Sequence, residues 1–403
     1  MFALAFRNIT RSRLRTALTL TAIACGVAAI IVSGGFVEDV FVQLRESTIR
    51  SRLGHAQVYR AGYLEFGDRE PGRYLIAKPD PLVDIVRALP HVEAVTSRVN
   101  FSGLANNGRA DLPVIGEGIE PERESRFASA MTFVAGRQLG GGDAFDVIVG
   151  EGVANALDLK PGSPINLTLS TTAGALNSLE FRVVGIFRTF SKEYDDRAIR
   201  ISKAAAQELL NSPAIHSVVV MLDETRNTDA AVAAIRLALG NQGYEVKPWH
   251  ELADFYSKTV ALYRRQFGAL QLIILVMLVL SVANTVNMVV HERTGEFGTL
   301  LALGSRRRQV FRLVLLENAL LGVVGAAVGM ALGIALAVIL STIGIAMPPP
   351  PGSNSGYTAS IRLVPWVIGA AAVTGAVAAA LAAILPGWRA ARMPVVEALR
   401  YNV

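Results

Sequence analysis

The chain has 403 residues, of which 52% are hydrophobic and only 18% are charged. Soluble domains carry about 25% charged residues, so this composition excludes an ordinary soluble protein. The net charge of +6 is concentrated in short arginine-rich segments beside apolar runs, which indicates membrane topology and argues against nucleic-acid binding.

Four runs without a charged residue are long enough to cross a bilayer. Each contains the roughly 20 apolar residues that a helix needs to span about 30 Å of hydrocarbon. The prolines at 348–351 interrupt the third run, so we expect its span to end near residue 345. The sequence therefore predicts four transmembrane helices, at residues 17–37, 267–290, 318–345 and 363–388.

The first run follows an arginine-rich segment without acids, which is also the pattern of a cleaved signal peptide. Because three further spans follow, we interpret residues 1–37 as an amphipathic segment and a retained first span. Arginines exceed acids in residues 1–16, in residues 291–312 and after residue 388. The positive-inside rule assigns these segments, and both termini, to the cytoplasm. Residues 38–266 then form an extracytoplasmic domain, and residues 267–403 hold the other spans.

Apolar residues at helical spacing flank this domain on both sides. Neither stripe meets a helix-stopping residue at the membrane edge. We therefore predict that the first two spans continue outward as a helical stalk of about 15 residues, or about 22 Å. Two separate amphipathic helices packed on the domain are the alternative. The stripes contain Phe41 and Leu44 on one side and Leu252, Phe255 and Leu262 on the other.

Within the domain, an α/β pattern occurs in two distant parts of the chain. A helix before Pro90 is followed by a strand at residues 92–99, and a helix at residues 228–239 lies between two further strands. Two such units predict a split ferredoxin-like subdomain. Short strands and turns at residues 147–201 predict a small β-rich subdomain between them. The predicted fold class is a membrane protein with four transmembrane α-helices and a large α+β extracytoplasmic domain on a helical stalk.

Two patterns within the spans indicate helix contacts. Glycines recur every four residues in the third span, which favours close approach of another helix. Polar residues recur every three residues on one face of the second span, and such groups normally face protein or water. Hydrogen bonding in a bundle or dimer is favoured over lining of a transport path. No charged residue lies inside any span, which argues against a proton- or ion-coupled carrier. These residues are Gly325, Gly329 and Gly333, and Ser281, Asn284 and Asn287.

The sequence contains no pattern for nucleotide binding, catalysis or metal binding. It has neither a phosphate-binding G-x-x-x-x-G-K-[ST] loop nor a G-x-S-x-G nucleophile motif. The five histidines lack metal-ligand spacing, and the single cysteine, Cys25, lies inside the first span. We therefore predict that this chain holds no catalytic residue, metal or cofactor.

Residues 291–309 leave the second span, carry glycines in a helical pattern and end in three arginines and a glutamine. With the start of the third span, this stretch resembles the C-terminal signature of the MacB/FtsX-type ABC transporter permeases, the type VII or mechanotransmission class. Residues 4–28 and 386–403 resemble the first span and the closing motif of that family. The signature positions are Glu296, Gly298, Leu303, Gly304, Ser305, Arg306, Arg307, Gln309 and Glu317.

The resemblance implies that residues 296–309 form a coupling helix, which a separate ABC ATPase subunit carrying ATP and Mg would contact. An apolar side would rest on that subunit, while arginines would pair with its acids or with lipid headgroups. The glycines would allow close approach or end a helical turn. The apolar side consists of Phe297, Leu300, Leu301 and Leu303, and the arginines are Arg306, Arg307 and Arg308.

The resemblance also implies a second permease copy, identical or different, a periplasmic adaptor or carrier, and a place in the bacterial inner membrane. Movement of the periplasmic domain would drive export or extraction of a lipoprotein, lipid, drug or peptide. The connection at residues 171–178 is shorter than the hook with which some lipoprotein-releasing permeases recruit a carrier. The alternative is an FtsX-like, non-transporting regulator of a cell-wall hydrolase, whose outer domain is usually much smaller than residues 38–266.

Overall fold

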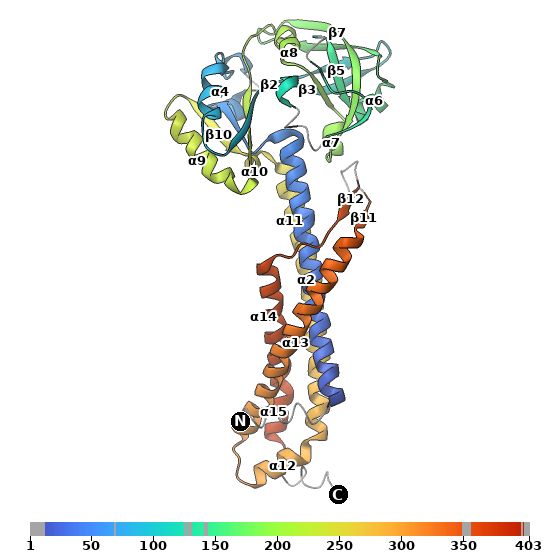
Figure 1. Cartoon of the computed structure of the whole chain (residues 1–403), viewed down its shortest axis with the longest axis vertical. Helices are drawn as coiled ribbons and strands as arrows, with labels where there is room; N and C mark the ends of the chain where they lie inside the picture. The colour runs from blue at the N-terminus through green and yellow to red at the C-terminus, as the bar shows by residue number, and fades with distance from the viewer. Residues whose placement is uncertain are drawn as a thin grey trace. The chain divides into compact units, whose positions relative to one another are not determined.

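The computed structural model of the protein describes residues 13–67, 70–124, 127, 131–140, 144–348, 356–395 and 398 (Figure 1). The amphipathic segment before residue 13, most of the proline-rich loop and the last five residues of the tail lie outside this description. The chain divides into two compact units. A helical unit comprises Met1–Phe41, Val260–Ala346 and Thr358–Val403, and an α/β unit comprises Val42–Thr259 and Met347–Tyr357.

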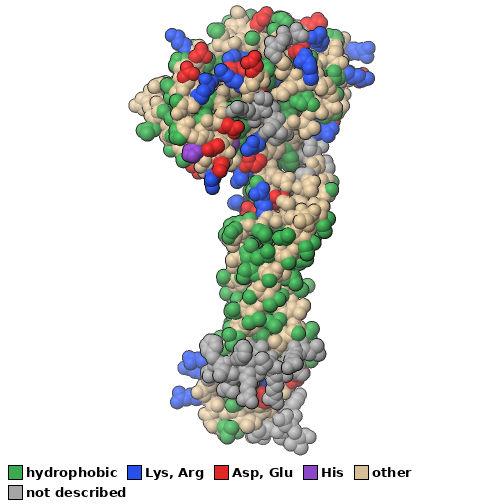
Figure 2. Space-filling model, in the orientation of Figure 1, with side chains coloured by type: hydrophobic (Ala, Val, Ile, Leu, Met, Phe, Trp, Pro, Cys, Tyr) green, Lys and Arg blue, Asp and Glu red, His purple; other side chains and the backbone are tan. Residues whose placement is uncertain are grey.

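The helical unit contains four helices that are long and apolar enough to cross a membrane. Hydrophobic side chains cover much of the visible surface of this unit (Figure 2). Two of these helices are unbroken over 36 and 39 residues and run well past the charge-free stretches. The four are α2 (Arg13–Thr48), α11 (Asp254–Glu292), α13 (Arg307–Ile343), and α14 (Pro365–Ala382) together with α15 (Ile384–Arg392). The short helix α12 (Thr294–Ala302) lies between α11 and α13 in the chain.

Several predicted boundaries differ from the structure. Helix α13 begins eleven residues before the predicted third span, because Arg312 and Glu317 interrupt the charge-free run but not the helix. The predicted fourth span is divided at Ala383 into α14 and α15. Pro386 lacks the N–H group that would bind the carbonyl of Ala382, which accounts for this interruption.

The three glycines of α13 lie against α2. A Cβ atom on Gly325 would lie 2.9 Å from Ile23, and one on Gly329 would lie 2.7 Å from the carbonyl oxygen of Ala24. A Cβ on Gly333 would lie 3.0 Å from Ile31. The absence of side chains at these positions therefore allows the backbones of α2 and α13 to approach closely.

One half of the α/β unit is a ferredoxin-like sheet, which confirms the predicted split ferredoxin-like subdomain. Its strands lie in the order β10-β1-β9-β2, and all neighbours are antiparallel. The chain order β-α-β-β-α-β is interrupted after the second strand by a long insert. The first strand, β1, was not predicted from the sequence. The elements are β1 (Ala56–Arg60), α4 (Pro79–Arg87), β2 (Val92–Asn106), β9 (Ser217–Leu222), α9 (Thr228–Leu239) and β10 (Tyr244–Pro248).

The insert is a six-stranded barrel that begins earlier than predicted. Strand β2 continues from the ferredoxin-like sheet and pairs with β3 and β6. The further pairs β3–β8, β8–β5, β5–β7 and β7–β6 close the ring, and β4 pairs with β7 outside it. Its elements are β3 (Asp111–Ile119), α5 (Pro121–Glu124), β4 (Thr132–Gly136), β5 (Asp146–Gly150), α6 (Glu151–Ala156), β6 (Pro164–Ser170), β7 (Leu176–Arg188), α7 (Lys192–Asp195), β8 (Ala198–Ser202) and α8 (Lys203–Leu210).

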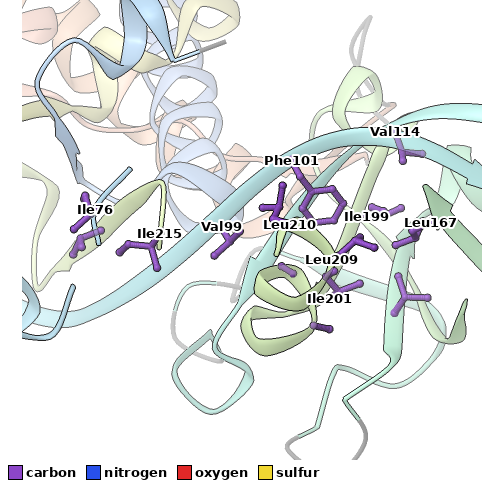
Figure 3. Packing of buried hydrophobic residues seen from close by; sticks show 14 of the residues in the cluster. Ile76, Val99, Phe101, Val114, Leu167, Ile199, Ile201, Leu209, Leu210 and Ile215 are labelled. Carbon is purple, nitrogen blue, oxygen red and sulfur yellow. The ribbon is translucent and has the colours of Figure 1, made fainter. Parts of the chain in front are cut away.

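One hydrophobic core runs through both halves of the α/β unit. It includes Ile76 and Ile215 beside the ferredoxin-like sheet and Leu167 and Ile199 inside the barrel, with Val99 of β2 between them (Figure 3). The two halves therefore fold as one body. The remaining short elements are the π-helical turn η1 (Ile49–Leu53), α3 (Tyr63–Phe66), η2 (Pro71–Arg73), η3 (Thr225–Asn227), α10 (Trp249–Leu252), β11 (Ile345–Met347) and β12 (Tyr357–Ala359).

We expect Gly329→Ala to destabilise the helical unit by about 1–3 kcal/mol, because the added methyl group overlaps the backbone of α2. Thermal unfolding in nanodiscs measures this effect. Gly369→Ala is the matched control, since a Cβ there meets nothing within 4 Å. Equal unfolding temperatures for the two variants would contradict the close approach of α2 and α13.

Candidate functional site

An ion pair between Arg293 and Glu317 connects the start of the short helix α12 to α13. Arg293 lies between α11 and α12, and its Nη1 donates to Oε2 of Glu317 at 2.7 Å. Its Nε donates to Oε2 of Glu296 at 2.8 Å, and its guanidinium lies 5.1 Å from the centre of the Phe297 ring. The side chain of Glu317 is only 9% exposed. This partly buried ion pair was not recognised in the sequence, where Arg293 was counted only as a topology signal.

The apolar side of α12 is divided between the interior and the surface. Phe297 is 1% exposed and belongs to the core of the helical unit together with Val290, Val310 and Val314. The prediction that Phe297 contacts another subunit is therefore wrong. Leu300 and Leu301 are partly buried against the same core, whereas Leu303 is 80% exposed.

Residues 296–309 do not form a single helix, contrary to the prediction. Gly298 is buried inside α12, which ends at Ala302, and Gly304 then adopts a left-handed φ of 92°. Such a φ favours glycine and reverses the chain direction. The N–H of Ser305 donates to the carbonyl of Leu300 within this turn.

The three arginines belong to the start of α13. The backbone N–H of Arg306 donates to Oε1 of Gln309 at 2.8 Å, which caps the helix. Arg306, Arg307 and Arg308 are exposed, and none forms an ion pair with another residue that the structure describes. The result is a surface of Leu303 and three arginines beside the turn.

A second set of bonds joins helices at the other end of the helical unit. The buried carboxylate of Asp39 on α2 accepts hydrogen bonds from the N–H of Ser360 and from Nε of Arg362, both at 3.0 Å. The N–H of Ile361 donates to Oγ of Ser341 on α13 at 2.9 Å. The segment before α14 therefore connects α2 with α13.

The polar stripe of α11 faces away from the helical unit's own core. Leu278, Val282 and the following buried valines form the inner face. Ser281 and Asn284 are exposed, and Asn287 is half-buried. These side chains therefore lie on the outward surface of α11.

The predicted stalk residues differ in their surroundings. Phe41 and Leu44 of α2 are buried, whereas Leu262 of α11 is 55% exposed. Leu252 belongs to α10, because Ala253 adopts non-helical dihedrals (φ −97°, ψ 62°) and α11 begins at Asp254. The side chain of Phe255 lies outside the described part of the chain.

Four buried charges, none of them predicted from the sequence, form a cluster inside the α/β unit. Arg98 (β2) donates from Nη2 to Oε1 of Glu124 (α5) at 2.6 Å, and Arg200 (β8) lies 3.0 Å from Oε2 of Glu117 (β3). All four side chains are at most 5% exposed. Burial alone would raise the pKa of Glu117, but Arg200, Arg98 and Arg52 lower it to about 2. The four charges therefore compensate one another.

This cluster holds the end of the segment formed by α2 and η1. Arg200 donates from Nη2 to the carbonyl of Ser51 at 2.8 Å, and Arg98 donates to the carbonyl of Arg52. The last carbonyls of a helix have no donor within the helix, so these guanidinium groups satisfy them. Arg52 also lies 3.3 Å from Glu117 and 4.9 Å from the ring centre of Tyr194. The end of this helical segment is therefore bound by both the shared strand β2 and the barrel strand β8.

Two models of known protein families match the chain. Residues 16–238 match the MacB-like periplasmic core domain, and residues 268–395 match the FtsX-like permease C-terminal domain. The chain belongs to the MacB/FtsX-like ABC permease family. The resemblance seen in the sequence is thereby confirmed, and the four apolar helices agree with a membrane protein.

Relatives of the chain include permeases and fused ATP-binding/permease proteins. An uncharacterized ABC transporter permease of Methanocaldococcus jannaschii is 23% identical over 80% of both chains. The macrolide export ATP-binding/permease protein MacB of Shewanella oneidensis is 24% identical, and the alignment covers 98% of this chain and 60% of MacB. The pyoverdine export ATP-binding/permease protein PvdT of Pseudomonas fluorescens is 25% identical over 98% of this chain and 58% of its own length.

Two solved extracytoplasmic domains show a low degree of similarity to the chain. The periplasmic region of MacB from Actinobacillus actinomycetemcomitans has a TM-score of 0.37 and 14% identity, covering 52% of this chain and 94% of its own. The extracellular domain of YknZ, a noncanonic ABC-type transporter from Gram-positive bacteria, has a TM-score of 0.34 and 13% identity. The comparison covers 48% of this chain and 98% of the YknZ domain.

We expect Glu124→Ala to destabilise the α/β unit by about 3–5 kcal/mol, because it leaves the buried Arg98 without its closest carboxylate. Hydrogen exchange of the strands in the full-length protein measures the loss. Glu122→Ala, on the exposed side of the same helix, should change stability by less than about 0.5 kcal/mol. A Glu124→Ala protein as protected as this control would contradict the role of the cluster.

A second prediction concerns His55, which is fully buried. Its Nδ1 accepts the N–H of Leu222, and its Nε2 lies 3.1 Å from Oγ1 of Thr225, which donates to Glu46. Burial lowers the pKa of His55 to about 4. The folded state therefore binds fewer protons than the unfolded state between pH 6.5 and about 4, so stability is complete above pH 6.5 and falls by about 3 kcal/mol as the pH approaches 4.

Hydrogen exchange of β1 and β9 at pH 7 and pH 5 measures this loss of stability. His55→Gln should be less stable at pH 7 but less sensitive to acid, because glutamine does not titrate. The exposed His250→Gln is the control and should keep the wild-type pH dependence. An unchanged pH dependence in His55→Gln would show that His55 does not cause it.

Proposed function

We propose that the chain is the permease subunit of an ABC transporter whose ATPase is a separate subunit. In this proposal, ATP-driven movement of α12 changes the conformation of the α/β unit. That change drives export or extraction of a substrate from the inner membrane or the periplasm. The observation that carries the proposal is the ion pair between Arg293 and Glu317, since it joins α12 directly to a membrane-spanning helix.

A continuous series of contacts supports transmission through the helical unit. Movement of α12 pulls on α13 through Arg293 and Glu317. Helix α13 lies against α2 along its glycines and is joined to it again through the segment that binds Asp39. Close-packed helices move as rigid bodies because their interfaces deform little.

The path continues within the α/β unit through the end of α2. Arg98 and Arg200 bind the carbonyls of Arg52 and Ser51, so a displacement of η1 acts on β2 and β8 at once. Because β2 belongs to both the ferredoxin-like sheet and the barrel, both halves respond to the same displacement.

Two exposed surfaces fit the partners that this function needs. Leu303 and the three arginines after it offer an apolar contact surrounded by positive charge, which suits an ATPase surface bearing acids. Ser281 and Asn284 on the outward face of α11 suit a second permease copy, because polar groups facing lipid are unfavourable. ATP and Mg would be bound by the ATPase, and both permease termini would be cytoplasmic.

The substrate class and a periplasmic adaptor or carrier are further parts of the proposal. MacB and PvdT are named for macrolide and pyoverdine export, whereas the archaeal relative carries no substrate in its name. A lipid or lipoprotein and a drug or peptide are both compatible with movement of an extracytoplasmic domain.

We expect Leu303→Glu to reduce recovery of the ATPase with the affinity-purified permease at least fivefold, because it places a charge on the proposed apolar contact. Quantitative mass spectrometry of native membranes measures the recovery. Leu237→Glu on α9 is the matched control, since Leu237 is 86% exposed in the α/β unit. If the wild-type chain recovers no ATPase in either detergent or nanodiscs, the proposed function is wrong.

A further inference from the structure

A cavity of about 310 Å³ lies inside the α/β unit beside the end of α2. This volume is near the lower end of the range for ligand-binding pockets, about 300–1,000 Å³. Residues of α2, η1, β3, α7, α10 and α11 line it. Its apolar wall includes Leu44, Leu53, Ile115, Phe190, Leu252 and Tyr256.

The rim of this cavity carries charges of both signs. Arg197 and Glu193 are exposed, four residues apart, and neither forms an ion pair with any residue in the described ranges. The two other charged residues in the lining are already paired, Arg52 with Glu117 and Asp254 with Lys258. An apolar cavity with one free cation and one free anion at its rim fits a hydrocarbon chain with a zwitterionic headgroup.

The helices that bound the cavity indicate where such a molecule comes from. Leu44 lies seven residues after Val37, the end of a charge-free run, on the same unbroken helix. Seven residues correspond to about 10 Å of helix rise. Tyr256 lies near the start of α11, which also continues into a span. Because both helices continue into candidate membrane spans, the amphiphile available to them is a membrane lipid.

We propose that this cavity binds a single-chain phosphoethanolamine lipid, with its hydrocarbon chain among the apolar residues. Its phosphate pairs with the guanidinium of Arg197, and its ammonium group pairs with the carboxylate of Glu193. The hydrocarbon chain of the bound lipid contacts Arg52, Ser51 and Tyr194. Ser51 accepts a hydrogen bond from Arg200 of the buried charge cluster, and Arg52 lies over the ring of Tyr194. A role of this lipid as cargo rests on the proposed transport function, whereas its binding does not.

Fluorescence quenching of Trp249 tests this proposal in the full-length chain. The ring of Trp249 lies 4.9 Å from that of Tyr256, and Trp366→Phe and Trp388→Phe remove the other two tryptophans. In nanodiscs, lysophosphatidylethanolamine with a nitroxide on its chain should quench Trp249 saturably. Absence of saturable quenching would overturn the proposal.

One pair of variants distinguishes binding in the cavity from insertion into the bilayer, and one variant with two labelled ligands distinguishes the headgroup from the hydrocarbon chain. Ile115→Glu should weaken the quenching at least fivefold, whereas Val134→Glu, at a comparably exposed apolar residue outside the cavity lining, should not. Glu193→Gln should weaken binding of the phosphoethanolamine lipid at least threefold without weakening that of a nitroxide-labelled fatty acid. Equal quenching in Ile115→Glu and Val134→Glu would exclude the cavity as the binding site. If Glu193→Gln changed the binding of both labelled ligands by the same factor, the headgroup assignment would be excluded.

These measurements use no ATPase and no transport assay. Failure of lipid binding would therefore leave the permease proposal to be judged by ATPase recovery, and loss of the ATPase would leave the lipid site intact. Binding together with ATPase recovery would support the lipid as a candidate cargo.

Discussion

The buried guanidinium groups of Arg98 and Arg200 impose the main constraint on the α/β unit. A buried charge that loses its partner costs several kcal/mol, so each arginine requires a carboxylate within the same interior. Those carboxylates come from β3 and α5, and one further N–H group of each arginine donates to a carbonyl of η1. Five elements must therefore assemble before the whole cluster is complete, and the end of α2 is fixed as a consequence.

Much of the fold could be predicted because its signals are local. A run without charges indicates a span whatever surrounds it, and the two α/β repeats indicated the ferredoxin-like half. The barrel could not be predicted in this way, because its closure depends on pairs such as Leu104 with Thr168, far apart in sequence. No local feature of β2 indicates that its first residues join one sheet and its last residues another.

The candidate site was predicted less completely than the fold. Periodicity shows which side chains share one face of a helix, but not whether that face packs against the same chain. Phe297 therefore looked like a contact for a partner although it is part of the interior. Arg98, Arg200 and Arg293 have the same local pattern as exposed arginines, and only the tertiary fold brings Glu124, Glu117 and Glu317 to them.

Closure of the barrel by β6 also limits where the sheet is open to other polypeptides. Along the described strand path, the terminal strands are β10 and β4. Strand β10 carries Glu245, Lys247 and Pro248, while β4 has five residues and an irregular register. Short, charged or irregular edge strands disfavour pairing with a foreign strand. The domain thus resists edge-to-edge aggregation without disulfides, since the only cysteine of the chain, Cys25, lies in α2.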